Sequence, residues 1–311
     1  GIRYQYILIL ILGGEKKMKK IKSREDRIFD FINALIMIFI CIFIAYPLYY
    51  VFMASFTDPA IVNSGKLLLY PEKLFFAGYQ KIISYKPLWT GFYNTILYTV
   101  TGTVVAIAVT VPCAYSLSRK DLAGRRVLNF LFTFTMFFNG GIIPLYLVIN
   151  KLGIYNTIFA MILPTAVSVY NLIVCRSFFD STISDELVEA AKLDGASDFR
   201  IFFRIVIPIS KTIIAVMILF YATSLWNSFM NALMFMGEQN KMPLQVILRN
   251  IVLSNQASSV LSSGADMIER QKLAEQLKYG VIVVSTLPLM VVYPFVQKYF
   301  AKGVMVGAVK G

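Results

Sequence analysis

The stretch from Ser184 to Pro208 reads SDELVEAAKLDGASDFRIFFRIVIP and lies between two long apolar runs. It predicts a helix, a turn and a second helix. Ser184 is a good N-cap for the first helix, Gly195 supplies the turn where that helix stops, and Ser197 is an N-cap for the second. Pro208 marks the entry into the apolar run that follows. A pair of short helices is therefore expected between two hydrophobic segments.

The rest of the chain has the composition of a membrane protein. Of its 311 residues, 58% are hydrophobic and 15% are charged, whereas a soluble domain is about 45–50% apolar and about 25% charged. Six charge-free runs are long enough to cross the hydrocarbon core of a bilayer. They are Phe31–Val51, Phe92–Tyr115, Leu128–Ile149, Ile158–Cys175, Thr212–Phe235 and Tyr279–Val296. With flanking residues, the last two spans are placed at 209–235 and 279–300, and the fold class is all-α integral membrane.

The charged residues predict the orientation of these spans. Twenty of the 30 Lys and Arg lie in the N-terminus, Ser116–Val127, Arg176–Lys211 and the C-terminus, which six spans place on one side. Because the basic side of a membrane protein faces the cytoplasm, both termini and Arg176–Lys211 are predicted to be cytoplasmic. The net charge of +13 is then a topology signal with affinity for anionic lipid, and it gives little reason to expect nucleic acid as a partner.

The first residues are unusual. The apolar run Tyr6–Leu12 is too short to span a bilayer, and a basic cluster follows it, which is the reverse of a signal peptide. We expect Met18 to be the natural start and residues 1–17 to come from upstream of it; an interfacial anchor is the alternative. Residues 1–29 are assigned as a basic cytoplasmic N-terminus, and residues 30–300 as the membrane domain.

The chain lacks the residues that several kinds of site need. It has no histidine, and its three cysteines lie within or at the end of apolar runs, as small buried side chains do. We expect no catalytic residues, no metal site and no cofactor on this chain. The nearest fragment to a phosphate-binding loop, Ser64-Gly65-Lys66, lacks the first Gly and the final Ser or Thr of that motif. Energy from ATP would have to come through another polypeptide.

The third apolar run is interrupted by Asn139, Gly140 and Gly141, with Pro144 close behind. Unpaired backbone inside a membrane is tolerated only where protein or water satisfies it. The interruption predicts either a kink or a broken helix that lines a solute pathway, and both interpretations stay open.

The fifth apolar run carries a polar stripe. Four polar residues are spaced to share one helix face, and two aromatic rings near them are candidate stacking surfaces. These residues are Ser224, Asn227, Ser228 and Asn231, with Tyr221 and Trp226. Because lipid would penalise such a stripe, it must face protein or water. It predicts either the wall of a polar-solute pathway or hydrogen bonds between helices.

The external segment 236–278 is long for a loop. It contains two helix-like pieces, Leu244–Leu253 and Ala265–Lys278, separated by the Ser-rich and Gly-containing piece Ser254–Gly264. A connection of this length with its own secondary structure is usually functional. We expect it to dock a soluble external partner.

The stretch quoted first resembles the signature of prokaryotic ABC-importer permeases. That signature is Glu-Ala-Ala, three residues, Gly, nine residues, Ile, one residue, an aliphatic residue and Pro. The matching positions are Glu189, Ala190, Ala191, Gly195, Ile205, Ile207 and Pro208, with Ile207 in place of the usual Leu. The likeness extends over Met18–Gly311, supported by Asn94-Thr95 and Trp226-Asn227. It is greatest to the smaller, maltose-type permease of carbohydrate importers, in the subgroup for complex oligosaccharides and polysaccharide fragments.

The resemblance implies a six-span type I ABC-importer permease whose cytoplasmic loop, 177–208, holds a coupling helix that contacts an ATPase. The residues implied in that contact are Glu189, Ala190, Ala191, Asp194, Gly195, Ser197 and Pro208. In the maltose system the Gly-rich tail, here within 301–311, also reaches between the ATPase subunits. This implies ATPase contacts for Gly307, Ala308, Val309, Lys310 and Gly311.

The resemblance also implies partners in a prokaryotic cell membrane. These are a second homologous permease, two copies of a cytoplasmic ABC ATPase that bind ATP and Mg, and an extracellular solute-binding protein. The substrate implied is a carbohydrate, in particular a complex oligosaccharide. Its pathway candidates on this chain are the interruption of the third run and the polar stripe of the fifth.

The sequence is less typical of two other classes of membrane protein. An ion-gradient-driven secondary transporter usually keeps ionisable residues within its spans, and none lies well inside the six runs. A glycan-modifying membrane enzyme would need paired acids near a membrane face. The external acids are scattered, at Asp58, Glu72, Glu238, Asp266, Glu269 and Glu275.

Overall fold

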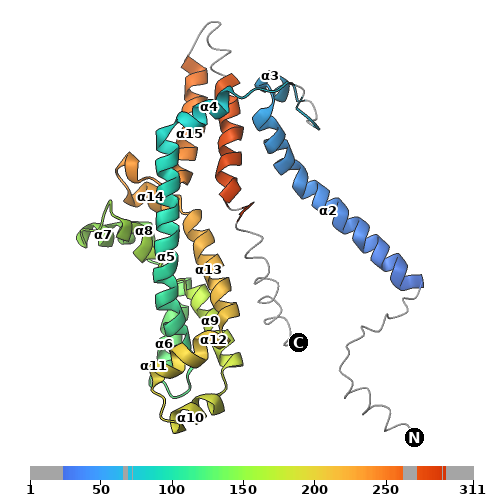
Figure 1. Ribbon diagram of the computed structural model, residues 1–311. Coiled ribbons are helices and arrows are strands. Elements are labelled where there is room, and N and C mark those ends of the chain that lie inside the picture. Colours follow the sequence, from blue (N-terminus) through green and yellow to red (C-terminus); the bar gives the residue numbers. More distant parts are fainter. Residues whose placement is uncertain (1–23, 66–68, 72, 262–271, 289, 292–311) are drawn as a thin grey trace. The chain divides into compact units, whose positions relative to one another are not determined.

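The computed structural model describes residues 24–65, 69–71, 73–261, 272–288 and 290–291, and within 254–261 it describes the backbone alone. Helices account for the regular structure of these residues, apart from one antiparallel bridge between Thr57 and Leu74 (Figure 1). The expected all-α class is confirmed. The chain divides into two units, Gly1–Tyr50 and Val51–Gly311.

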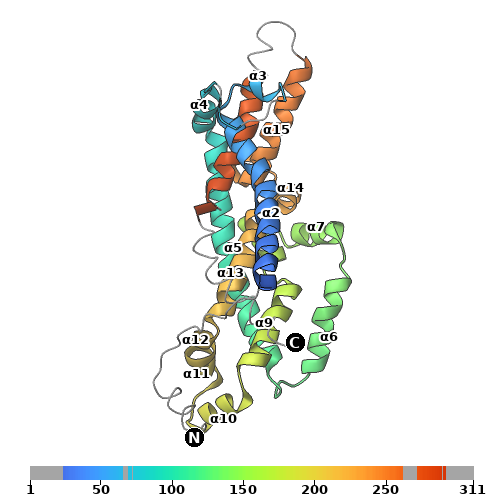
Figure 2. The ribbon, with the colours of Figure 1, turned by 90° about the vertical axis from the view of Figure 1, so that its right-hand side faces the viewer.

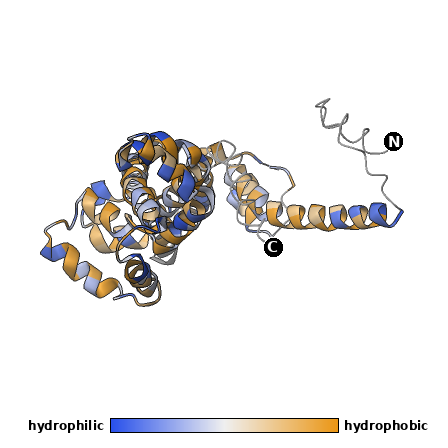
Figure 3. Cartoon of the chain, turned by 90° about the horizontal axis from the view of Figure 1, so that it is seen from below, coloured by the Kyte–Doolittle hydropathy of each residue, from blue (hydrophilic) through white to orange (hydrophobic). Residues whose placement is uncertain are grey.

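Most of helix α2 (Arg24–Phe56) lies in the first unit. Its 33 residues correspond to about 50 Å of helix, which exceeds the thickness of a bilayer. It begins seven residues before the expected span, and Glu25 and Asp26 in its first turn favour that start because they complement the positive end of the helix. Apolar residues lie all along it after the polar first turns (Figure 3). A helix of this kind is stable in lipid.

Helix α5 (Lys86–Ser118) is the central element of the second unit and lies along α13 (Lys211–Trp226) and α9 (Val169–Thr182) (Figures 1 and 2). Small residues allow the close approach of α5 and α13. A Cβ atom on Gly102 would lie 2.8 Å from Cδ1 of Leu225. The hydroxyl groups of Thr110 and Tyr221 lie 2.7 Å apart and join the two helices. Small and hydroxyl-bearing residues are the usual means of packing helices in a membrane.

The remaining apolar runs form bent pairs of helices. Helix α6 (Arg125–Phe137) meets α7 (Ile142–Lys151) at 113°, as Figure 2 shows. Helix α8 (Ile158–Ile162) continues into the 3₁₀ turn η1 (Leu163–Thr165) and meets α9 at 50°. The segment Asp198–Ile209 meets α13 at 81°. In the described residues, two helices are long and apolar enough to span a membrane, or up to five if each bent pair is one span. The predicted count of six therefore stays a prediction.

Two features of the fourth apolar run differ from the expectation. The run Ile158–Cys175 is not one straight helix, since Pro164 lies in η1 and its ring removes a backbone donor. Helix α9 then continues to Thr182, past residue 177, where the sequence predicts the start of the loop.

Short elements build the region around the start of α5 and the end of α13. They are α3 (Pro59–Val62), α4 (Ala77–Ser84), α14 (Met230–Phe235), η3 (Gln239–Lys241), α15 (Leu244–Leu261) and helical residues 272–288. Helix α15 contains the expected helix Leu244–Leu253 but continues through most of the piece expected to separate two helices. No Gly or Pro occurs in that piece before Gly264, and Ala and Ser are tolerated in helices. The other expected helix, Ala265–Lys278, lies in the described residues only from 272 onward.

One buried amide ties this region together. Gln276 is fully buried, and its Oε1 accepts a hydrogen bond of 2.7 Å from the backbone N–H of Gly78. Its Nε2 donates to the backbone oxygens of Ser55 and Phe75. The helical segment 272–288 is thereby joined to the end of α2 and the start of α4.

Candidate functional site

Helix α10 (Asp185–Leu193) and helix α11 (Asp198–Ile201) form the predicted pair of short helices at the end of the molecule farthest from α15 (Figure 1). The Ser184 hydroxyl accepts from the backbone N–H of Leu187 at 3.3 Å, and the Ser197 hydroxyl accepts from that of Arg200 at 3.4 Å. Gly195 has φ +77°, a left-handed conformation that glycine adopts without strain. The two caps and the turn therefore lie where the sequence predicts them.

One face of α10 is anchored and the other is open. Val188 is 1% exposed and packs with Ala191 in the apolar cluster formed by α5, α9, α11 and α13. Glu189 and Ala190 are exposed. At the end of the helix Leu193 is 89% exposed, which is unusual for a leucine in a folded protein. The open face thus offers the short side chain of Ala190, the carboxylate of Glu189 and the protruding apolar side chain of Leu193.

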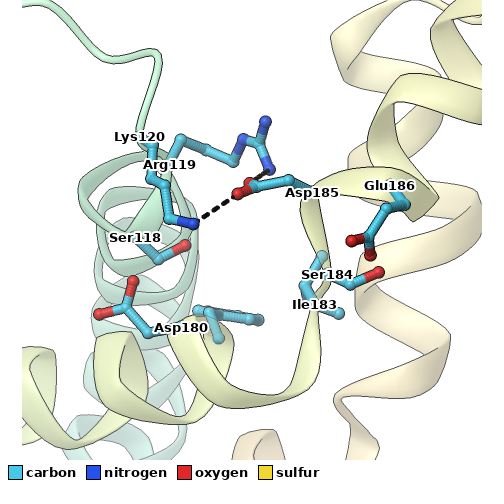
Figure 4. A pocket seen from close by; sticks show the side chains of 9 residues that line it. Ser118, Arg119, Lys120, Asp180, Ile183, Ser184, Asp185 and Glu186 are labelled. Atoms are coloured by element: carbon cyan, nitrogen blue, oxygen red, sulfur yellow. Dashed lines mark hydrogen bonds and ion pairs between the residues drawn. The ribbon is translucent and has the colours of Figure 1, made fainter.

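Two cations at the end of α5 hold the start of α10 (Figure 4). Arg119 Nη1 donates to Asp185 Oδ1 at 3.0 Å, and Lys120 Nζ lies 2.8 Å from Asp185 Oδ2. The hydrogen bond from Lys120 is the main cause that lowers the pKa of Asp185. The same contact raises the pKa of Lys120, so the pair is ionised at neutral pH.

The same loop also holds the end of α10. Lys192 Nζ lies 3.5 Å from Asp121 Oδ2 and 3.4 Å from Asp198 Oδ1 at the start of α11. The hydrogen bond with Asp198 is the main cause that raises the pKa of Lys192. Arg119 Nε lies 3.3 Å from Asp121 Oδ1 and thus joins the two ends of the network.

A pocket of about 220 Å³ lies beside these contacts, between the end of α5 and the connection from α9 to α10. Residues of both signs line it, as Figure 4 shows for Arg119, Lys120, Asp180 and Glu186. In the described residues no cluster of three or more metal-ligating side chains occurs.

The connection from α11 to α13 is irregular. Residues Phe202–Val206 form one turn of π-helix (η2), and Ile207–Ile209 (α12) precede the 81° bend at Ser210. Pro208 has no N–H to donate to the preceding turn, which explains why the α-helical pattern changes just before it. The expectation that Pro208 stands at the entry to the fifth apolar run agrees with this position.

The interruption of the third apolar run is an exposed turn. Asn139 Oδ1 accepts from the backbone N–H of Gly141 at 2.8 Å, and Gly141 has φ +84°. Gly140 and Asn139 lie with it at the 113° bend between α6 and α7. The predicted break is therefore present, and its role in a pathway stays a prediction.

The polar stripe of the fifth run does not lie on one continuous helix. Helix α13 ends at Trp226, and α14 starts at Met230. Asn227 lies at the end of α13, where its side-chain amide donates to the carbonyl of Thr223 at 2.9 Å. Such local bonds compete with the helical pattern. Ser224 and Asn227 are exposed, while Ser228 and Asn231 are half-buried beyond the break.

The two aromatic candidates are core residues in this conformation. Tyr221 is buried, and its hydroxyl also accepts a hydrogen bond from the backbone N–H of Ser168 at 3.0 Å. Trp226 packs in an apolar cluster with Leu88, Leu244 and Ile247. Neither ring offers the free stacking surface that we expected, because α5 and α9 pack over Tyr221, and α5 and α15 pack over Trp226.

Sequence reasoning missed the ion pairs around α10. Arg119 and Asp185 are separated by 66 residues, and the sequence shows only a basic turn and an acidic first helical turn. Only the fold brings these together. The tail candidates Gly307, Ala308, Val309, Lys310 and Gly311 lie outside the described residues.

Comparison with known proteins agrees with this arrangement. Residues 88–306 match the family model described as binding-protein-dependent transport system inner membrane component. The chain is 40% identical, over 92% of its length and all of the relative, to the polygalacturonan/rhamnogalacturonan transport system permease protein YtcP of Bacillus subtilis (strain 168). It is 37% identical to protein LplC of the same organism, over 93% of the chain and 97% of the relative.

A solved structure is also similar. It is the crystal structure of a bacterial ABC transporter involved in the import of the acidic polysaccharide alginate, with 35% identity and a TM-score of 0.80, over 91% of this chain and all of that chain. The relatives' names describe permease proteins and not enzymes. The sequence signature, the helical fold with apolar spans and these matches lead to one conclusion: the chain belongs to the family of inner-membrane permease components of binding-protein-dependent ABC transport systems.

Proposed function

We propose that this chain is one permease subunit of an ATP-driven importer for an oligosaccharide, and that α10 is the element that receives force from a separate ATPase. The observation that carries the proposal is the form of α10. It is fixed to the membrane helices along one face, while its other face is open and ends in the protruding Leu193.

The chemistry of the open face supports docking to a protein. Glu189 is exposed, and within the described chain it forms no ion pair, so its carboxylate is available to a cation on a partner. Leu193 would gain about 1.5–3 kcal/mol if a partner buried it fully. Ala190 leaves the helix surface low, which permits close approach. Two copies of a cytoplasmic ATPase, which bind ATP and Mg themselves, are the proposed partners on this side.

The apolar exterior supports a second membrane subunit. Helix α6 buries none of its residues within the chain, although Phe130, Phe134 and Phe137 lie along it. Lipid and a homologous permease are the partners that we propose for this surface. The interruption at Asn139 and the break at Asn227 are proposed to border the pathway between the two permeases.

The proposed orientation follows from charge. Six spans with both termini and α10 in the cytoplasm place the basic residues on the inner face, and α15 with η3 on the outer face, where a solute-binding protein would deliver substrate. The membrane proposed is that of a prokaryotic cell. In this topology α10 lies on the inner face, within reach of a cytoplasmic ATPase.

An acidic oligosaccharide is the substrate that the outer region favours. The guanidinium of Arg249 in α15 lies 5.2 Å from the centre of the Phe229 ring, at the break between α13 and α14. Within the described residues no carboxylate pairs with it, so it is available to a uronate carboxylate. One relative is named for polygalacturonan and rhamnogalacturonan, and the solved neighbour imports alginate. A guanidinium beside an aromatic ring suits a carboxylated sugar.

The coupling role is tested by Glu189→Lys in the full complex. The variant should insert in the membrane but lose uptake and weaken co-purification of the ATPase, because a carboxylate at the contact becomes a cation. Glu25→Lys makes the same charge change at the start of α2 and should retain both properties. Normal uptake by Glu189→Lys would remove the assignment of α10.

The energy source and the substrate are tested in vesicles. Uptake should require ATP on the side of α10 and should persist when ion gradients are collapsed by ionophores. Uptake without ATP would instead support a secondary transporter. With labelled oligogalacturonate and a neutral maltooligosaccharide of equal length, Arg249→Gln should reduce acidic uptake selectively, while Lys278→Gln serves as a control cation on the same side.

A further inference from the structure

We propose that Arg119 is a positioning residue that joins α10 to the end of α5, so that displacement of α10 moves the central helix directly. This inference rests on the proposed role of α10 in coupling. It assigns a function to a side chain outside the Glu-Ala-Ala signature and outside the loop that carries it.

The path of the chain explains why such a link is needed. Along the backbone, α10 is preceded by α9 and followed by α11 and α13. Helix α5 has no direct covalent connection to this segment, because it leads into α6. Yet α5 packs against more of the fold than any other helix. A force on α10 therefore reaches α5 only through side-chain contacts.

Arg119 is placed to carry that force. It is the C-cap residue of α5, and its side chain is 15% exposed. Its Nη1 holds Asp185 at 3.0 Å and its Nε holds Asp121 at 3.3 Å. Asp121 in turn approaches Lys192 at the other end of α10. Residues at the end of α5 and in the loop after it thus form ion pairs with both ends of α10, and the guanidinium of Arg119 connects the two sets of ion pairs.

Apolar packing beneath the ion pairs adds stiffness. The ring of Tyr115, one turn before Arg119, lies 5.7 Å from that of Phe179 in α9 and 5.4 Å from that of Phe202 in η2. Val188 of α10 belongs to the same buried cluster. The end of α5, α9, α10 and the start of η2 therefore behave as one body, and the ion pairs fix the rotation of α10 on it.

Three facts favour a positioning role over a purely structural one. The contacts are directional, since a guanidinium binds two carboxylates in fixed geometry. They join elements that are far apart in sequence. They also lie at both ends of α10, at Asp185 and Lys192, rather than along its buried face.

The test measures coupling in the complete complex, reconstituted with binding protein and ATPase. Arg119→Gln should leave ATPase co-purification intact but lower the number of sugars transported per ATP hydrolysed by about fivefold or more, the low end of the usual range of allosteric coupling. The matched control is Arg126→Gln, in the same basic turn, because Arg126 is exposed and forms no ion pair within the described residues.

A second variant guards against the possibility that Arg119→Gln lowers coupling only because the protein misfolds. Asp185→Asn keeps the shape of the side chain and should lower the same ratio. If Arg119 acts through Asp185, the double variant should be no worse than either single one. Additive losses, or a wild-type ratio in Arg119→Gln, would overturn the inference. If the wild-type chain captures no ATPase, the proposed function fails instead, so the two failures are distinguishable.

Discussion

At the scale of single residues, glycines and buried polar groups decide how closely the helices approach. Gly102 allows α5 to contact Leu225 of α13, and Gly195 permits the turn after α10. The two glycines serve different purposes. At Gly102 the space is filled by a neighbour, whereas nothing lies within 4 Å of a Cβ atom on Gly195, where only the backbone conformation matters.

Gly102→Ala should therefore destabilise the membrane domain. Its Cβ would lie 2.8 Å from Leu225 Cδ1, so the buried Leu225 side chain would have to shift, at a cost of about 1–3 kcal/mol. Gly140→Ala is the control, because the nearest atom to its Cβ is 3.8 Å away. Thermal unfolding of the two purified variants in detergent checks the difference. Equal melting temperatures would show that the interface is looser than described.

The ion pair at the start of α10 should be insensitive to pH across the physiological range. Lys120 and Arg119 lower the pKa of Asp185, so the stabilisation is complete above the ordinary carboxyl pKa of about 4 and is lost only as the pH falls through the lowered value. The difference in stability between wild type and Asp185→Asn should stay constant from pH 8 to pH 5. A difference that declined within that interval would contradict the lowered pKa.

At the scale of elements, the breaks within the helices decide where polar backbone lies inside the apolar runs. The third and fourth apolar runs are each bent at a turn, and the fifth is interrupted by a turn between α13 and α14. Gly141, Pro164 and Asn227 lie at or beside these turns, and each has a local reason to interrupt a helix. The bends leave polar backbone at α6–α7 and α13–α14, which is tolerated in a membrane only beside protein or water.

Gln276→Leu should loosen the join between helical residues 272–288 and α4. The leucine fills similar space but leaves the N–H of Gly78 and the carbonyls of Ser55 and Phe75 without their partner, at a cost of about 1–3 kcal/mol per buried group. Hydrogen exchange should rise at Gly78 and in α4 while the exchange of α10 stays unchanged. Unchanged protection at Gly78 would refute this arrangement.

At the scale of the whole molecule, the open surfaces suit an assembly of several chains. The α10 surface, the apolar face of α6 and the α15 region have different chemistry, and each suits a different partner of the proposed importer. This division is what an importer needs, because the ATPase, the second permease and the binding protein must act at the same time.

The orientation is testable with single cysteines in a variant that lacks Cys41, Cys113 and Cys175. A membrane-impermeant maleimide added to intact cells should label Gln239→Cys in η3 and should not label Leu193→Cys. Opening the cells should expose Leu193→Cys to the reagent, because that side chain protrudes from the protein. The reverse pattern would place α10 outside and remove its contact with an ATPase.

The features that the sequence alone determined are local ones. The helix caps at Ser184 and Ser197, the turn at Gly195 and the interruption at Asn139–Gly141 depend on residues within a few positions of one another, and the apolar runs depend on composition. The structure has the two caps, the turn and the interruption at their expected positions.

Tertiary structure decided what depends on partners distant in the chain. Tyr221 and Trp226 are covered because α5 and α15 pack over them, which no periodicity in the fifth run could reveal. The prediction that the polar stripe forms one helix face was wrong, because α13 ends at Trp226, and the side-chain amide of Asn227 bonds to the carbonyl of Thr223 at that end. The grip of Arg119 on Asp185 exists only because the fold brings the end of α5 to the start of α10, since an ion pair depends on distance in space and not in sequence.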